Sequence, residues 1–151
     1  GKGDNIQENK EKIEQVISNG EAYRKFLQLV ENQGGDISYI ENTEKFTKAK
    51  YKMPVEAVKT GYVQKLNAEK VGKIAMHLGA GRMKKEDDID YAVGIELLKK
   101  VGCQVEQGET IAYIYADDEQ IGREVLEKLQ QTYEIGEQNV EKVADIIEII
   151  E

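Results

Sequence analysis

The segment GYVQKLNAEKVGKIAMHLGAG, residues 61–81, determines the fold class, because its periodicity changes from that of a strand to that of a helix. After a turn at Gly61, the stretch 62–66 is typical of a short strand. Asn67 then offers a side chain suited to capping a helix. Apolar residues follow at the i, i+3, i+4 and i+7 spacing of one helix face: Val71, Ile74, Ala75 and Leu78. A strand that leads directly into an amphipathic helix indicates a unit of mixed α and β structure.

Strand patterns lie on both sides of this segment. Residues 50–57, KYKMPVEA, alternate apolar and polar side chains, and Pro54 lacks the N–H that a ladder needs, so an edge strand is expected here. Residues 109–117, ETIAYIYAD, are apolar on both faces, which predicts a strand covered on both sides. The stretch 92–102 is also expected to be extended, and the turn-rich residues 102–108 connect it to the next strand.

Two helices are predicted at the start of the chain. Apolar side chains repeat at helical spacing in residues 5–18, where Asp4 is the expected N-cap and Gly20 the stop. The same spacing recurs in residues 21–33. These helices are expected to form a hairpin with one apolar side, which needs a partner surface.

The pattern changes near residue 45, where the helices give way to the α+β unit. We therefore expect a helical hairpin in residues 1–45 and a second domain in residues 46–151. The second domain should be a mixed sheet with two main helices, over 68–78 and 119–131. The final residues, ADIIEIIE, 144–151, are expected to form a strand that anchors the C-terminus.

Charge and residue counts exclude several classes of function. The 151 residues carry a net charge of −8, so nucleic acid is not an expected partner, because phosphate backbones require a basic face. The single Cys103 and the single His77 exclude an internal disulfide and a zinc site made of thiolates and imidazoles. No apolar run long enough for a membrane span and no signal-peptide pattern is visible. The chain is expected to be cytoplasmic, with neither nucleic acid nor membrane as a partner.

The stretch HLGAGRMKKEDD, residues 77–88, has the glycines and cations of a phosphate-binding loop in the wrong structural order. A phosphate cradle follows a strand and opens a helix, whose N-terminal N–H groups bind the anion. Here Gly79 follows the last periodic residue of a helix, so it is expected to cap the helix C-terminus in the left-handed conformation. The negative end of the helix attracts the nearby cations Arg82, Lys84 and Lys85. The alternative is a mobile loop that contacts a neighbouring domain or closes over a site.

The remaining chemically versatile residues do not assemble a site. His77 lacks a serine, cysteine or aspartate partner placed for a triad. Cys103 lies in a turn without a nearby base, and the acidic run 86–90 lacks the ligand spacing and central glycine of a calcium loop. Five tyrosines fall at strand-like positions and need only packing to explain them: Tyr62, Tyr91, Tyr113, Tyr115 and Tyr133. No catalytic, substrate-binding or metal-ligating residue is predicted in this chain.

Three segments of the chain resemble, nearly position for position, the C-terminal portion of pyrimidine-nucleoside phosphorylases. They are SNGEAYRKFLQLVENQGGD (18–36), KAKYKMPVEA (48–57) and the long stretch 61–118. Within them, the motifs QGGD, LGAGR, AVGIEL and VGCQVEQGE occur in an order specific to this family. Cys103 departs from a common aspartate and Tyr91 from histidine or leucine, and neither touches a functional motif. The resemblance extends to the first residues, so the N-terminus is expected to be a cut inside a longer protein.

The resemblance implies an α+β fold: an α/β-hammerhead domain, preceded by a helical hairpin left over from the large α/β domain of a longer enzyme. It also implies a homodimeric, cytoplasmic glycosyltransferase. Such an enzyme uses phosphate to cleave uridine, thymidine or deoxyuridine into the free base and ribose or deoxyribose 1-phosphate. In that family the groups that bind phosphate, the base and a potassium ion lie upstream of residue 1. The chain alone is therefore expected to be inactive, with the rest of its own polypeptide as its partner.

The resemblance also implies a use for residues 79–85. A cleft between two domains must close during phosphorolysis, and a closing loop needs glycine hinges and unpaired cations. Gly79, Gly81 and Arg82 are the candidate domain-closure residues, and the loop is expected to be among the most mobile parts of the chain.

The alternative to a phosphorylase fragment is a hammerhead interaction module or a biotinyl- or lipoyl-like carrier of another enzyme, because residues 101–112 resemble the carrier hairpin. The carrier lysine at a hairpin tip is absent, however, and a regulatory domain that has borrowed the fold is a third interpretation.

Overall fold

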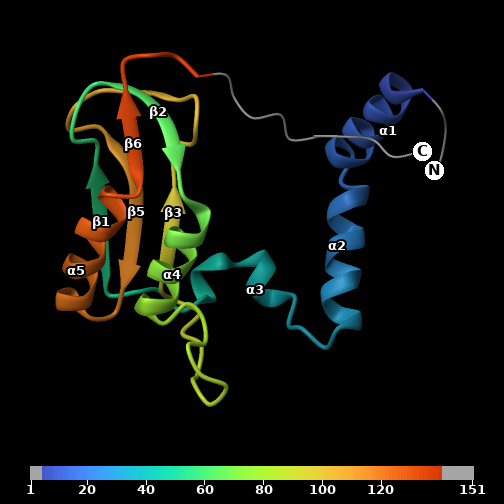
Figure 1. The fold of residues 1–151 in the computed structure, drawn as a ribbon. Helices are drawn as coiled ribbons and strands as arrows, with labels where there is room; N and C mark the ends of the chain where they lie inside the picture. The colour runs from blue at the N-terminus through green and yellow to red at the C-terminus, as the bar shows by residue number, and fades with distance from the viewer. Residues whose placement is uncertain (1–4, 141–151) are drawn as a thin grey trace. The chain divides into compact units, whose positions relative to one another are not determined.

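The computed structural model describes residues 5–140, and the chain divides into two compact units after Phe46 (Figure 1). Within the described residues, the first unit contains helical elements only, and the second contains strands with two longer helices. Residues 1–4 and 141–151 lie outside the described part. The expected cap Asp4 and the expected strand 144–151 fall there.

The first unit begins with the two predicted helices, α1 (Ile6–Ser18) and α2 (Glu21–Asn32). Asn5 caps α1: its side-chain oxygen accepts hydrogen bonds from the N–H groups of Gln7 and Glu8 at 3.0 and 3.3 Å. The expected cap at Asp4 is therefore wrong by one residue, because an amide side chain at residue 5 satisfies the same orphan donors. Gly20, with φ of 79°, turns the chain between the helices.

The apolar side of α1 and α2 lies on the surface of this unit. Neither helix has a buried residue. Ile13 and Ile17 are 58% and 64% exposed, and Phe26 and Leu29 are 45% and 56% exposed. The predicted uncovered apolar stripe is thus present within this unit. The unit ends with the short helix α3 (Ser38–Glu41) and the 3-10 turn η1 (Thr43–Lys45).

The second unit contains two three-stranded sheets. One has the order β1-β5-β3, formed by Tyr51–Glu56, Thr110–Ala116 and Gly94–Leu97. The other has the order β4-β2-β6, formed by Gln104–Val105, Gly61–Leu66 and Tyr133–Gly136. All pairs among these strands are antiparallel. The α+β class is confirmed, whereas the expected single mixed sheet is wrong, because the chain between β1 and β2 directs consecutive strands into different sheets.

The edge position of Pro54 is confirmed, since β1 pairs only with β5 and ends its sheet. One face of the central strand β5 is buried: Ala112, Ile114 and Ala116. The other face carries Ile111, which is fully buried, and Tyr113 and Tyr115, which are half-buried. The Lys52 Nζ lies 3.9 Å from the centroid of the Tyr113 ring. The expected cover on both faces of β5 is therefore complete at Ile111 and partial over the tyrosines, where a lysine lies on the Tyr113 ring.

Two strands were not predicted. β4 lies in the stretch interpreted as a turn, and β6 follows the last helix. β4 has only two residues, too few to show a period of two, whereas β6 alternates buried and exposed positions over only four residues. Tyr133, the first residue of β6, is 6% exposed, and its hydroxyl donates a hydrogen bond to the Ile111 carbonyl at 3.3 Å.

Both main helices agree with the sequence. Asn67 caps α4 (Ala68–Leu78) by accepting the Lys70 N–H at 3.0 Å, as predicted. Asp118 caps α5 (Glu119–Gln130) by accepting the Ile121 N–H at 3.0 Å. The two helices contact each other, and α5 also packs on β1 and β5. The core that they cover includes seven large side chains that are fully buried: Val55, Val63, Val105, Ile111, Ile114, Val125 and Leu129. No helix in residues 5–140 is both long and apolar enough to span a bilayer.

Candidate functional site

The candidate site is the α4–β3 loop, residues 79–93, and it begins with a helix cap at Gly79. The φ of Gly79 is 104°, in the left-handed region, and its N–H donates to the Met76 carbonyl at 3.0 Å. The Ala80 N–H donates to the Ala75 carbonyl at 3.0 Å. These two hydrogen bonds form the Schellman arrangement that commonly ends helices. The predicted cap is confirmed.

Gly81 keeps the loop close to the last turn of α4. A Cβ placed on Gly81 would lie 2.9 Å from the Cγ of Met76, so a larger residue has to displace that flexible side chain. The backbone of Gly81 lies outside the left-handed region. Gly81 is therefore required for close packing, whereas Gly79 is required for its conformation.

The tip of the loop is organised by Asp87. The Oδ2 atom of Asp87 accepts hydrogen bonds from the N–H groups of Met83 and Lys84 at 3.0 and 2.8 Å. The Asp87 N–H donates in turn to the Lys84 carbonyl at 3.2 Å. Aspartate side chains often close turns in this way, because they accept backbone donors that no helix or sheet satisfies.

The base of the loop is tied to the helix by Asp90. Its N–H donates to the Gly79 carbonyl at 3.0 Å, and its Oδ1 accepts the Ala92 N–H at 2.9 Å. The loop therefore has internal hydrogen bonds at its base and at its tip. Its expected mobility stays a prediction.

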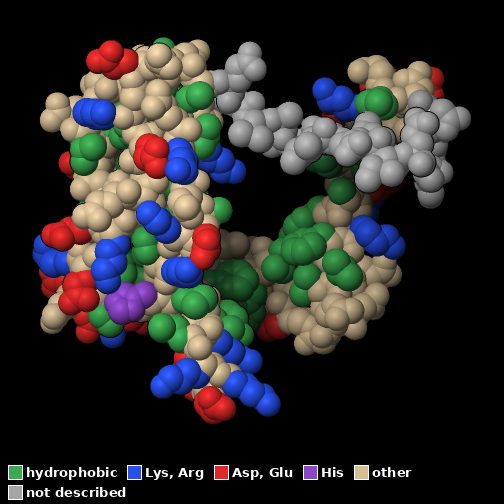
Figure 2. Space-filling view, in the orientation of Figure 1, with side chains coloured by type: hydrophobic (Ala, Val, Ile, Leu, Met, Phe, Trp, Pro, Cys, Tyr) green, Lys and Arg blue, Asp and Glu red, His purple; other side chains and the backbone are tan. Residues whose placement is uncertain are grey.

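The loop exposes cations and apolar side chains together. Arg82, Lys84 and Lys85 are exposed, and none of them forms an ion pair with another residue in 5–140. Figure 2 shows the Lys and Arg side chains gathered where this loop protrudes below α4. Met83 and Tyr91 are 67% and 90% exposed. The strand-like packing expected for Tyr91 is wrong, because the residue lies in the loop before β3.

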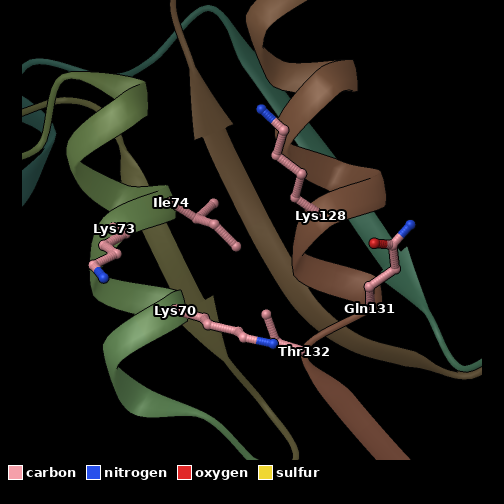
Figure 3. Close-up of a pocket in the computed structure, with 6 residues that line it drawn as sticks. All are labelled: Lys70, Lys73, Ile74, Lys128, Gln131 and Thr132. Atoms are coloured by element: carbon pink, nitrogen blue, oxygen red, sulfur yellow. The ribbon is translucent and has the colours of Figure 1, made fainter.

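A separate groove between α4 and α5 gathers lysines from both helices (Figure 3). It has a volume of about 280 Å³ and is lined by Lys70, Lys73, Ile74, Lys128, Gln131 and Thr132. The three ammonium groups are on exposed side chains, and Lys73 pairs with Glu69 at 2.6 Å. Thr132 is buried, but its hydroxyl already donates to the Leu129 carbonyl at 2.7 Å. The groove thus offers solvent-screened positive charge and no acid–base pair.

A second polar hollow, of about 330 Å³, lies beside β4 and contains an ion pair. Lys99 Nζ lies 2.6 Å from the Glu109 carboxylate. Their hydrogen bond raises the pKa of Lys99 and lowers the pKa of Glu109. Both groups therefore stay charged over a wider pH range than usual, which suits a structural contact and not proton transfer near neutral pH.

The other residues considered from sequence are dispersed. His77 is exposed in the last turn of α4, and Cys103 is half-buried before β4. Burial raises the pKa of the Tyr133 phenol to about 12. Within residues 5–140, no three His, Cys, Asp or Glu side chains are arranged to hold a metal ion. The described chain therefore shows a structured cationic loop, with no convergent catalytic groups beside it.

Comparison with known proteins assigns the second unit to a family. A model of the pyrimidine nucleoside phosphorylase C-terminal domain matches residues 62–136. The chain belongs to this domain family. It is 43% identical over 135 residues to a pyrimidine-nucleoside phosphorylase of Bacillus subtilis (strain 168). It is 38% identical over 136 residues to a pyrimidine-nucleoside phosphorylase of Staphylococcus aureus (strain USA300).

These alignments cover most of this chain but a minor part of each relative. They include 89% and 90% of the chain and 31% of either relative, so the chain spans about a third of their length. The family model contains the α4–β3 loop and the lysine groove, and it ends where β6 ends. The resemblance drawn from the motifs is confirmed.

The sequence identified Gly79, Gly81 and Arg82 but missed the two aspartates that shape the loop. A signal was present for Asp87, because an aspartate outside any helical pattern often hydrogen-bonds to nearby backbone groups in a turn. The lysine groove had no such signal. Lys70 and Lys128 line one groove only because α4 packs against α5.

Proposed function

We propose that this chain is the C-terminal part of a pyrimidine-nucleoside phosphorylase. The intact enzyme transfers the pentosyl group of uridine, thymidine or deoxyuridine to phosphate, and it releases the free base and ribose or deoxyribose 1-phosphate. The proposal is supported by the family domain and by relatives that carry this activity in their names. We assign the activity to a longer polypeptide that contains this chain. That polypeptide forms a cytoplasmic homodimer, and its residues outside this chain bind phosphate and potassium.

Within that enzyme, this chain supplies a domain-closing surface and no reacting group. The hydrogen bonds and the exposed cations of the α4–β3 loop support this role. Hydrogen bonds fix its base and tip, and it presents three cations that form no ion pair with residues 5–140. Cations held ready in this way form charge-assisted hydrogen bonds when an acidic surface of another domain approaches. Closure then excludes water, so that phosphate and not water attacks the pentose carbon that carries the base.

The substitution Arg82→Ala in the intact enzyme tests this role. One hydrogen bond to a charged group contributes about 1.5 kcal/mol, so its loss from the closed state lowers kcat/KM by about tenfold. The fold is expected to stay intact, because the Arg82 side chain is exposed and makes no ion pair in the described chain.

The matched control is Lys65→Ala. Lys65 is also an exposed cation, and it pairs with Glu134 at 3.2 Å on the surface of β2. Its removal should leave kcat/KM unchanged. Equal kinetics for wild type, Arg82→Ala and Lys65→Ala would refute the closing role and favour an interaction module without a part in catalysis.

A further inference from the structure

Asp87 has more backbone partners than any other side chain of the α4–β3 loop. Its carboxylate accepts two consecutive N–H groups, from Met83 and Lys84, at 3.0 and 2.8 Å. Its own N–H closes the same turn through the Lys84 carbonyl at 3.2 Å. One half-buried side chain therefore fixes the backbone from residue 83 to residue 87.

The neighbouring acids do not share this role. Glu86 and Asp88 are exposed, and neither accepts a hydrogen bond from another residue in 5–140. The acidic run 86–90 is thus not uniformly exposed. It contains two aspartates that bind the backbone, Asp87 and Asp90, with exposed acids between and before them.

The position of Asp87 has a consequence for the cations beside it. Arg82, Lys84 and Lys85 lie within four residues of one another, so their like charges favour a spread of conformations in which they separate. Asp87 opposes that spread, because it places a negative charge inside the turn and holds the amides of residues 83 and 84. A loop that is ordered before contact loses less conformational entropy when it docks.

We propose that Asp87 is a positioning residue that holds Arg82, Lys84 and Lys85 in one arrangement, in which they dock together on an acidic surface of the rest of the polypeptide. This inference rests on the proposed closing role of the loop. Asp87 itself touches no reacting group. It acts through the cations, and its removal disorders the tip and weakens docking.

Amide hydrogen exchange on the 151-residue chain tests the first half of the proposal without any enzyme assay. In Asp87→Ala, the Met83 and Lys84 amides should exchange about tenfold faster, since each loses a hydrogen bond to a charged acceptor. Asp87→Asn retains a side-chain oxygen and should restore part of the protection. Asp88→Ala, the adjacent control, should change nothing. Unchanged exchange at residues 83 and 84 in Asp87→Ala would overturn the proposal.

Kinetics of the intact enzyme test the second half. Asp87→Ala should lower kcat/KM at least as much as Arg82→Ala, and the double variant should lose less than the product of the two single losses, because both changes weaken one docking step. Additive losses would show that Asp87 acts independently of the cations and would overturn the positioning role. Faster exchange in Asp87→Ala with unchanged kinetics in Arg82→Ala would instead locate the failure in the closing function itself.

Discussion

Replacing Gly79 with alanine should weaken the C-terminal end of α4 without crowding any neighbour. A Cβ at Gly79 would lie 3.7 Å from the nearest atoms, on Asp90 and Val93, which is ordinary van der Waals contact. The cost is therefore conformational. The φ of 104° lies in the left-handed region, where alanine is about 1 kcal/mol less stable than glycine. A loss of about 1 kcal/mol reduces the folding equilibrium constant roughly fivefold.

Urea unfolding followed by circular dichroism measures this loss as a lower midpoint at constant slope. Two further variants make the test specific. Gly79→Asn should recover part of the stability, because asparagine enters the left-handed region more readily than alanine. Gly72→Ala, the same substitution inside α4 with no atom within 4 Å of the new Cβ, should instead stabilise by about 0.5–1 kcal/mol. If Gly79→Ala and Gly72→Ala shift the free energy of unfolding in the same direction, the left-handed backbone at Gly79 does not determine the effect of alanine there.

Three other predictions concern the second unit. Leu129→Ala removes a fully buried core side chain of α5 and should lower the free energy of unfolding by about 2–5 kcal/mol, whereas a loss below 1 kcal/mol would place Leu129 outside the core. Burial raises the pKa of Tyr133 to about 12, so ultraviolet titration should show a phenol that ionises near pH 12 and is missing in Tyr133→Phe. Stability from Tyr133 is present below its unfolded pKa of about 10 and is lost as pH rises towards 12; identical ultraviolet titration curves for the wild type and Tyr133→Phe near pH 12 would contradict this. The pKa of Glu109 is lowered by Lys99, so Glu109→Gln should be destabilising at neutral pH, and this difference should vanish as pH falls through the lowered pKa; a difference independent of pH would exclude the ion pair as its cause.

Local signals predicted the parts of the fold that are determined within a few residues. α4 was predictable because Asn67, a four-residue apolar stripe and Gly79 specify its start, its buried face and its end within one short stretch. The edge position of β1 followed from Pro54 alone, since proline cannot donate to a second neighbouring strand. In the candidate site, the cap at Gly79 and the exposed cations could be predicted for the same reason.

The remaining features depend on residues that are distant in the chain. β1 pairs with β5, about sixty residues later, and strand periodicity carries no information about the partner. The same limit explains why two antiparallel sheets replace the expected mixed one. Tyr113 was expected beneath a second layer because it is aromatic within an apolar strand. Instead, the Nζ of Lys52, on β1, lies over its ring. The hydrogen bonds at the base and tip of the α4–β3 loop were missed because single side chain–backbone contacts leave no periodic trace.

We propose that this chain contributes a closing surface while the catalytic groups lie in the rest of the polypeptide. The most direct test is turnover by the purified 151-residue chain, after cooperative unfolding has shown that it is folded. Incubated with uridine and phosphate, the chain should release no uracil above the buffer rate, whereas the intact enzyme should release uracil and ribose 1-phosphate in equal amounts. Release of uracil in proportion to the concentration of the isolated chain would instead place catalytic groups within these 151 residues.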